Sequence, residues 1–159
     1  MSIYDFNTSN LLNWTTAFAI FEIPMAFFYI SISSKNRPVI DWYSGNNINI
    51  WNVIIQDFVY VILGIIIATR LFKYLVKKNI IYKNFIYFLL ILIIVQISGD
   101  LLFSLIINYW PLNYTSFWIM WFKNYIKKSS FNALFGDTLY VIAWSISYYF
   151  VYNYINRFD

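Results

Sequence analysis

The segment "NVIIQDFVYVILGIIIATRLF", residues 52–72, is the stretch that decides the fold class. A helix of about 20 mostly apolar residues can cross the hydrocarbon core of a bilayer, and this run reaches that length. Its apolar residues are continuous and do not alternate with a period of two, which favours a membrane helix over a barrel strand. Gln56 and Asp57 lie inside the run, where a charged group is costly, so the segment also raises a question of function.

The composition of the whole chain agrees with a membrane protein. Of 159 residues, 61% are hydrophobic and 11% are charged, whereas an ordinary soluble domain has about 25% charged residues. A soluble protein of this length could not bury so much apolar surface. Histidine and cysteine are absent, which excludes disulfides and histidine-based catalysis.

Four apolar runs are long enough to span a bilayer, at about residues 11–33, 50–72, 84–110 and 131–155. We therefore expect an all-α protein, an integral membrane four-helix bundle that forms a single transmembrane domain over residues 1–159. The first run lacks the basic residues that precede the apolar part of a signal peptide, so we expect it to be retained. The segment "TSFWIMWFKNYIKK", residues 115–128, suggests a short interfacial helix or simply the aromatic belt before the last span.

Two of these helices carry residues that predict an irregularity. Pro24 is expected to kink the first helix, because proline removes a backbone donor and clashes with the preceding turn. The third run is too long for one upright span, so it is expected to tilt, to kink near Ser98-Gly99 or to project beyond the lipid.

The basic residues lie mostly in short connections, which is how membrane proteins set their orientation. The compact 73–83 connection, with Arg70 just before it, favours a cytosolic location for both termini. No basic face or recognised motif suggests nucleic acid, so the lipid bilayer is the expected partner.

Each apolar run contains one acidic residue: Glu22, Asp57, Asp100 and Asp137. At 1.5 Å per helical residue all four lie in the same half of the membrane, on the side away from residues 73–83. Polar or small residues continue each helix face at spacings of three or four, and such faces are expected to turn towards one another. These faces comprise Thr15, Ala19, Glu22 and Ala26 on the first helix; Asn52, Gln56 or Asp57, Tyr60 and Gly64 on the second; and Gln96, Asp100, Ser104 and Asn108 on the third.

A faint internal repeat accompanies three of the acids. The phrases "DFVY" (57–60), "DLLF" (100–103) and "DTLY" (137–140) share one pattern. They suggest two helical hairpins related by a pseudo-twofold axis along the membrane normal.

The acids predict a site for a proton or a cation inside the bundle. Its expected ligands are Glu22, Asp57, Asp100 and Asp137 with the amides of Gln56 and Gln96, and Arg70 is a candidate counter-ion. Carboxylates can exchange protons, and their oxygens bind hard cations such as Na⁺, Mg²⁺ or Ca²⁺. A small channel or transporter is the leading interpretation, and a homo-oligomer is expected because four spans often need a second copy to enclose a path.

Simpler interpretations stay open for the same residues. The acids could form a purely structural hydrogen-bonded network, and Arg70 could reach water from the end of its helix. Asp137 could be an N-cap if the fourth helix began at Thr138, and Asp100 could lie near the surface. A structural or scaffolding membrane protein, for example of a viral envelope, is therefore the alternative function.

An enzyme that acts on lipid through carboxylates and a metal ion is a second alternative. It is less favoured, because the sequence has no phosphate-cradling loop and no D-x-x-D motif on one helix.

Three segments carry a resemblance: "IIQDFVYVILGIIIATRLF", "QISGDLLFSLIINYWP" and "FKNYIKKSSFNALFGDTLYVIAW". Their arrangement resembles that of small uncharacterised four-span membrane proteins of large (giant) DNA viruses, over most of residues 50–144. The resemblance implies a viral membrane location and no defined activity.

Overall fold

The computed structural model describes residues 2–31, 49–111, 113 and 116–155, with the side chains of 29–31 and 128–133 outside the description. Within these residues the regular structure is entirely helical, which confirms the predicted all-α class. The helices are α1 (Thr8–Ser31), α3 (Ile50–Lys77), α4 (Phe85–Tyr109) and α5 (Phe117–Ile155).

Three helices in the described part of the chain are long and apolar enough to cross a membrane. They are α1 over Thr8–Phe28, α3 over its whole length and α4 over its whole length. These three match the first three predicted spans. The fourth span stays a prediction, because α5 is not in this set and its last turns are rich in tyrosine and asparagine.

Asparagine side chains mark where two of the helices begin. The side chain of Asn49 accepts a hydrogen bond of 3.0 Å from the backbone of Trp51, and that of Asn84 accepts one of 2.9 Å from Tyr87. Both asparagines have the extended backbone typical of an N-cap. Capping satisfies amide groups that the first helical turn leaves without partners.

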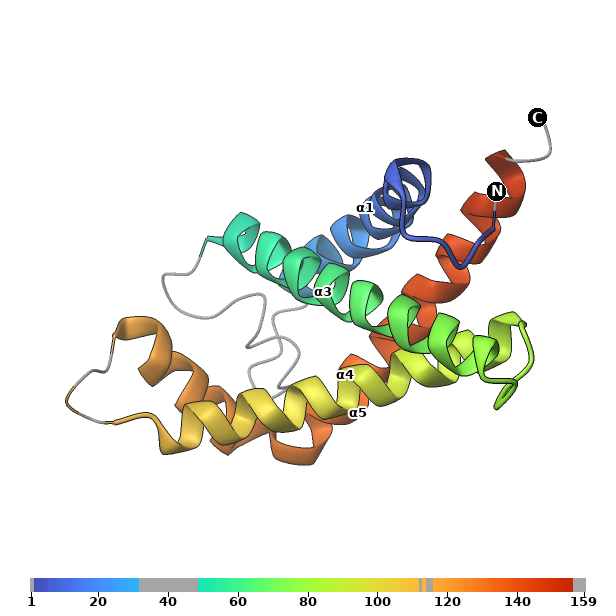
Figure 1. Cartoon of the computed structure of the whole chain (residues 1–159). Helices are drawn as coiled ribbons and strands as arrows, with labels where there is room; N and C mark the ends of the chain where they lie inside the picture. Colours follow the sequence, from blue (N-terminus) through green and yellow to red (C-terminus); the bar gives the residue numbers. More distant parts are fainter. Residues whose placement is uncertain (1, 32–48, 112, 114–115, 156–159) are drawn as a thin grey trace.

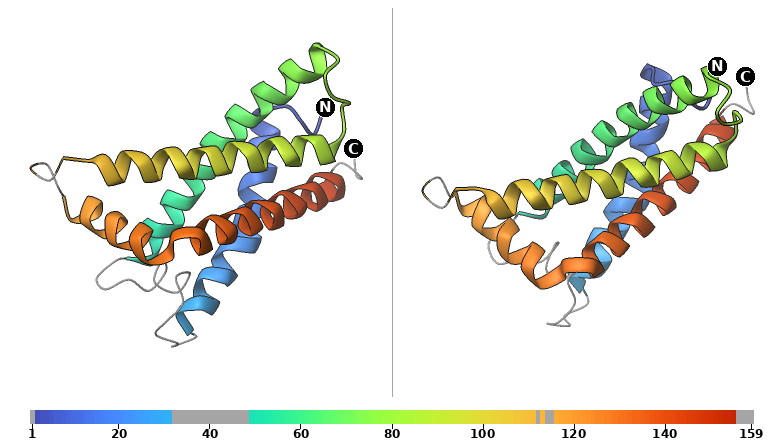
Figure 2. Two further views of the ribbon diagram at one scale, coloured as in Figure 1. Left: turned by 90° about the horizontal axis from the view of Figure 1, so that it is seen from below. Right: turned by 60° about the horizontal axis from the view of Figure 1, so that its bottom comes forward.

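The last predicted span differs most from the structure. Residues 115–128 and 131–155 were expected as an interfacial helix and a separate span, but α5 runs without a break from Phe117 to Ile155. Figure 2 shows that this long helix changes direction along its length. Because Asp137 lies inside α5, its interpretation as an N-cap is wrong.

The other two predicted irregularities leave the helices continuous. Pro24 lies within α1, which extends past it to Ser31. Ser98 and Gly99 lie within α4, and the helix continues for ten residues beyond Gly99 to Tyr109.

Each helix packs against two neighbours, so that α1 contacts α3 and α5, and α4 contacts α3 and α5 (Figure 1). Aromatic contacts show that neighbours run antiparallel: early α1 meets late α5 where Trp14 stacks on Tyr148 with ring centroids 3.7 Å apart. Late α3 meets early α4 where Phe72 contacts Phe88 at 5.5 Å. The axes of α3 and α4 are inclined to each other (Figure 2).

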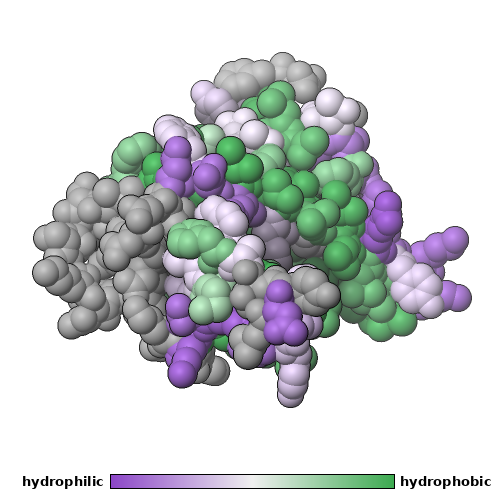
Figure 3. All heavy atoms as spheres, turned by 90° about the vertical axis from the view of Figure 1, so that its left-hand side faces the viewer, coloured by the Kyte–Doolittle hydropathy of each residue, from purple (hydrophilic) through white to green (hydrophobic). Residues whose placement is uncertain are grey.

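A buried core lies between the helices, and much of the outer surface is apolar. Ala17, Ile65, Ala68 and Trp144 are completely buried. On the face seen in Figure 3, hydrophobic residues form much of the surface of the described residues. Large exposed apolar surfaces in a helical protein indicate contact with lipid or with other chains.

Candidate functional site

The centre of the candidate site is the carboxylate of Asp100 on α4. The hydroxyl of Tyr60 on α3 donates a hydrogen bond of 2.7 Å to its Oδ1 atom, and the amide of Gln96 donates one of 3.0 Å to the same oxygen. The Oδ2 atom is buried, and no described residue donates a hydrogen bond to it. One oxygen of this carboxyl group is therefore held by two donors, while the other is available inside the protein.

A second carboxyl group, that of Asp137 on α5, lies close enough to interact electrostatically with Asp100. It also acts electrostatically on the Tyr60 hydroxyl. We refer to Tyr60, Gln96, Asp100 and Asp137 as the Asp100 cluster. Its members come from three helices, α3, α4 and α5.

The positions of these side chains follow from helix geometry. Gln96 and Asp100 are four residues apart and therefore project from the same face of α4. Tyr60 reaches that face because residue 99 is a glycine: a Cβ atom at Gly99 would lie 2.7 Å from the Tyr60 hydroxyl oxygen. Any larger residue there would push the tyrosine away from Asp100.

Glu22 is fully buried, with 0% of its surface exposed. It lies one residue after Phe21, whose ring contacts Tyr140 of α5 at 5.3 Å. Phe18, one turn earlier, contacts Phe58 of α3 at 5.1 Å. These contacts place Glu22 on the part of α1 that faces α3 and α5, at a level close to that of Asp137.

The remaining predicted residues lie around this centre. Gln56 and Asp57 are half-buried, in the turn of α3 that precedes Tyr60. Arg70 is exposed, in the half of α3 that leads to the α3–α4 connection. That exposure is typical of an arginine that reaches water from within an apolar helix.

The structure thus brings together Gln96, Asp100 and Asp137 and buries Glu22 nearby. Sequence reasoning did not assign a role to Tyr60 in the site, although it placed that residue on the polar face of its helix. The sequence signal that could have found it is the pairing of Tyr60 with the small residue Gly99 at antiparallel positions.

A metal centre built on three carboxylates is not found among the described residues. The two carboxyl groups of the Asp100 cluster, with the hydroxyl of Tyr60 and the amide of Gln96, have the chemistry to bind a proton or a hard cation. Both fit oxygen ligands in a largely apolar setting.

Comparisons of the chain with protein families, with curated proteins and with solved structures found no match. The resemblance to viral membrane proteins therefore remains a prediction.

Proposed function

We propose that this chain is a membrane protein that binds and transfers protons at the Asp100 cluster. The observation that carries the proposal is the arrangement of the Asp100 carboxyl group, which accepts two hydrogen bonds on Oδ1 and has a buried Oδ2 without a donor. A proton on Oδ2 would remove the negative charge of a buried carboxyl oxygen that no donor stabilises. Ionisable groups inside a membrane protein are rare, and proton relays are one of their established uses.

The neighbouring carboxyl group provides the second station for the proton. Asp137 interacts electrostatically with Asp100, so a negative charge on one favours a proton on the other. Tyr60 and Gln96 keep the Asp100 carboxyl in one orientation while the proton moves. Glu22 is a further acid at a similar level, and Asp57 and Gln56 extend the polar region along α3.

The proposal includes the topology that the sequence predicts. In it α5 is the fourth span, both termini lie in the cytosol, and a second copy of the chain completes the path. The close packing of α5 against α1 supports α5 as the fourth span, since Trp144 and Tyr148 are completely buried there. Single cysteines placed in this cysteine-free chain would test the topology by their labelling from each side of a vesicle.

Proton flux into proteoliposomes loaded with a pH-sensitive dye tests the function. Asp100→Asn and Asp137→Asn are each expected to reduce the flux at least tenfold. Asp41→Asn, which makes the same chemical change between the first two apolar runs, is the matched control. Unchanged flux in both cluster variants would disprove proton transfer at this site.

A hard cation is the second candidate ligand of the same cluster. Flux that depends on Na⁺, Mg²⁺ or Ca²⁺ and not on the pH gradient would identify it. A structural role, in a viral or a cellular membrane, is the alternative function, and the hydrogen bond from Tyr60 to Asp100, which joins α3 to α4, favours it. Under that alternative the cluster variants would lower the stability of the protein, and the wild-type protein would conduct nothing.

A further inference from the structure

A cavity of about 190 Å³ lies at the end of the molecule where α3 passes into α4. The N-terminal segment, residues 2–7, forms one wall, and the end of α3 forms the other. A water molecule in the liquid occupies about 30 Å³, so the cavity has room for a group of several non-hydrogen atoms. Its lining residues are Ser2, Tyr4, Asp5, Phe72, Lys73, Val76, Lys77 and Lys83.

The charge of this lining is strongly positive, with three lysines and one aspartate. Asp5 is already engaged, because its Oδ1 atom lies 2.7 Å from the ammonium nitrogen of Lys73. Lys77 has no ion pair in the described structure, and neither has Lys83, whose ammonium nitrogen lies 6.0 Å from the centre of the Tyr4 ring. Two cations therefore face the cavity without a close ion pair to a carboxylate among the described residues, although Lys83 also acts electrostatically on Asp5.

The turn between the helices places these two cations on the same cavity. Asn79 has a φ of 56°, in the left-handed region where asparagine is better tolerated than most residues. The amides of Asn79 and Ile80 donate hydrogen bonds of 3.0 Å to the carbonyls of Val76 and Leu75. This is a Schellman ending, which reverses the chain at once and brings Lys83 back beside Lys77.

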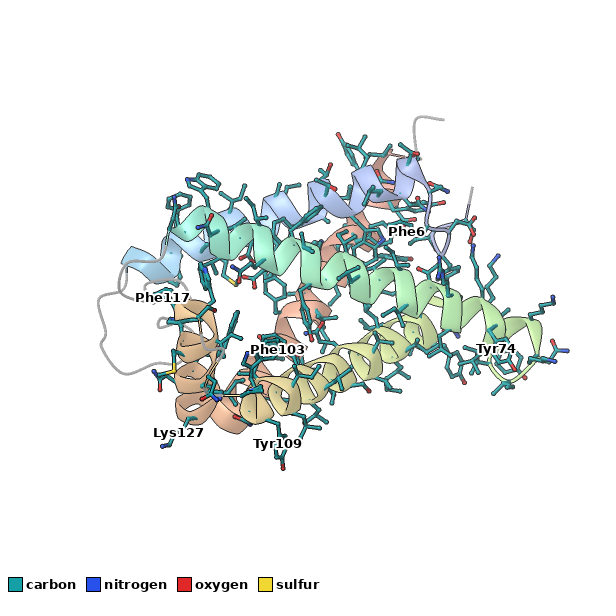
Figure 4. All side chains as sticks on the ribbon, turned by 60° about the vertical axis from the view of Figure 1, so that its left-hand side comes forward. Phe6, Tyr74, Phe103, Tyr109, Phe117 and Lys127 are labelled. Carbon is teal, nitrogen blue, oxygen red and sulfur yellow. The ribbon has the colours of Figure 1, made fainter. Side chains whose placement is uncertain are left out.

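The floor of the cavity and its surroundings are apolar. Phe72 is buried, and the ring of Tyr4 packs on it with centroids 4.9 Å apart. Beside the cavity, Tyr74, Ile80 and Tyr82 are more than half exposed. Figure 4 shows Tyr74 at this end of α3. Exposed tyrosines and apolar residues next to lysines, at the end of apolar helices, are typical of the membrane–water interface.

We propose that this cavity binds the phosphate of an anionic lipid headgroup. Lys77 and Lys83 bind the phosphate oxygens, while the exposed apolar residues beside them contact the acyl chains. Basic pockets between membrane helices are a recognised form of headgroup site. The lipid is favoured over free phosphate, because the cavity adjoins exposed apolar residues at the end of two helices that are long enough to span a bilayer. This site does not depend on proton transfer at the Asp100 cluster.

Binding of phosphatidylglycerol to the purified full-length protein, counted by native mass spectrometry from phosphatidylcholine nanodiscs, tests the proposal. One lysine near an anionic membrane surface contributes about a fivefold change in affinity. Lys77→Gln combined with Lys83→Gln is therefore expected to weaken binding of phosphatidylglycerol about 25-fold. Phosphatidylcholine should not bind in its place.

The control removes two charges that do not line the cavity. Lys78→Gln changes the residue next to Lys77, and Lys127→Gln changes a residue at the opposite end of the molecule from Tyr74 (Figure 4). This double variant is expected to keep its affinity within about twofold, since screened charges outside the site contribute little. Equal losses in the two double variants would overturn the site.

Two further results decide what occupies the cavity. Displacement of phosphatidylglycerol by an excess of inorganic phosphate would overturn the lipid as occupant. Circular dichroism separates loss of binding from loss of fold: both double variants should keep the wild-type helix content, because all four lysines lie at exposed positions.

Discussion

The hydroxyl of Tyr60 lies 2.7 Å from the Oδ1 atom of Asp100 and joins α3 to α4 through the Asp100 cluster. Forty residues separate the two side chains in sequence. The hydrogen bond is therefore a tertiary contact that depends on how the two helices cross. It positions the carboxyl group to which we assign proton binding, and it also holds the helix pair together.

Replacing Tyr60 with phenylalanine removes this donor and leaves the ring in place. Asp100 keeps only the hydrogen bond from Gln96, and we expect the free energy of unfolding to fall by about 1–3 kcal/mol. Unfolding in mixed detergent micelles measures the change. Tyr74→Phe, the same substitution at an exposed position on the same helix, should change stability by less than about 0.5 kcal/mol. Equal effects of the two substitutions would show that the hydrogen bond contributes nothing.

Substituting Gly64 of α3 and Gly99 of α4 with alanine should have opposite effects. A Cβ atom at Gly64 would meet nothing within 4 Å, so Gly64→Ala should stabilise α3 by up to about 1 kcal/mol. A Cβ atom at Gly99 would lie 2.7 Å from the Tyr60 hydroxyl, so Gly99→Ala should displace that side chain and lower the stability. Detergent unfolding of the two variants, side by side, measures both changes.

A double-mutant cycle identifies the cause of the Gly99 effect. Phenylalanine at position 60 has no hydroxyl, and the next atom of the ring, Cζ, would lie 3.5 Å from the added methyl group, an ordinary contact. In a Tyr60→Phe background, Gly99→Ala should therefore cost nothing further. A cost that persists in that background would mean that the helices themselves are too close for alanine.

Much of this site could be predicted from the sequence. The rarity of charges in apolar runs singled out Glu22, Asp57, Asp100 and Asp137, and four-residue spacing placed Gln96 beside Asp100. The partner from α3 could not be predicted, because Gln56, Asp57 and Tyr60 all lie on its polar side. Which of them meets Asp100 depends on the rotation and crossing of two helices, and these are set by packing over their whole length.

The helix that contains Asp137 shows the other limit of sequence reasoning. Lysines and serines at 127–130 interrupt the hydropathy between the aromatic segment and the last apolar run, and this favoured two separate helices. The backbone of α5 nevertheless continues through them, because none of these residues breaks a helix as proline does. Hydropathy predicts where lipid can lie, and it does not by itself predict where a helix ends.

The contact between α1 and α5 gives a prediction about the core. Trp144 is completely buried, and its indole nitrogen donates a hydrogen bond of 3.0 Å to the backbone carbonyl of Trp14. Trp144→Phe loses this bond and leaves a cavity, so the stability should fall by about 1–3 kcal/mol. Trp51→Phe, the same change at a residue with 50% exposure, should have a much smaller effect in the same unfolding experiment.

The ion pair between Asp5 and Lys73 predicts a dependence of stability on pH. The hydrogen bond from Lys73 holds the pKa of the Asp5 carboxyl below its ordinary value of 3.8. The Asp5 pKa is thus lower in the folded protein than in the unfolded chain, and the pair stabilises the folded protein at pH values above 3.8. This contribution is lost as the pH falls through the pKa that Asp5 has in the folded protein. Both side chains are partly exposed, so the contribution should be about 1 kcal/mol or less.

Comparison of the wild type with Asp5→Asn isolates this contribution from that of the other carboxylates. The difference in unfolding midpoint should be constant from pH 6 to pH 8, since an ionised aspartate is present throughout that range. It should shrink at acid pH and in high salt, because salt screens an exposed pair. The Lys73→Gln variant should lose the same amount of stability as Asp5→Asn. Adding Asp5→Asn to Lys73→Gln should lower the stability no further. A difference that grows as the pH falls would show that Asp5 destabilises the N-terminal segment instead.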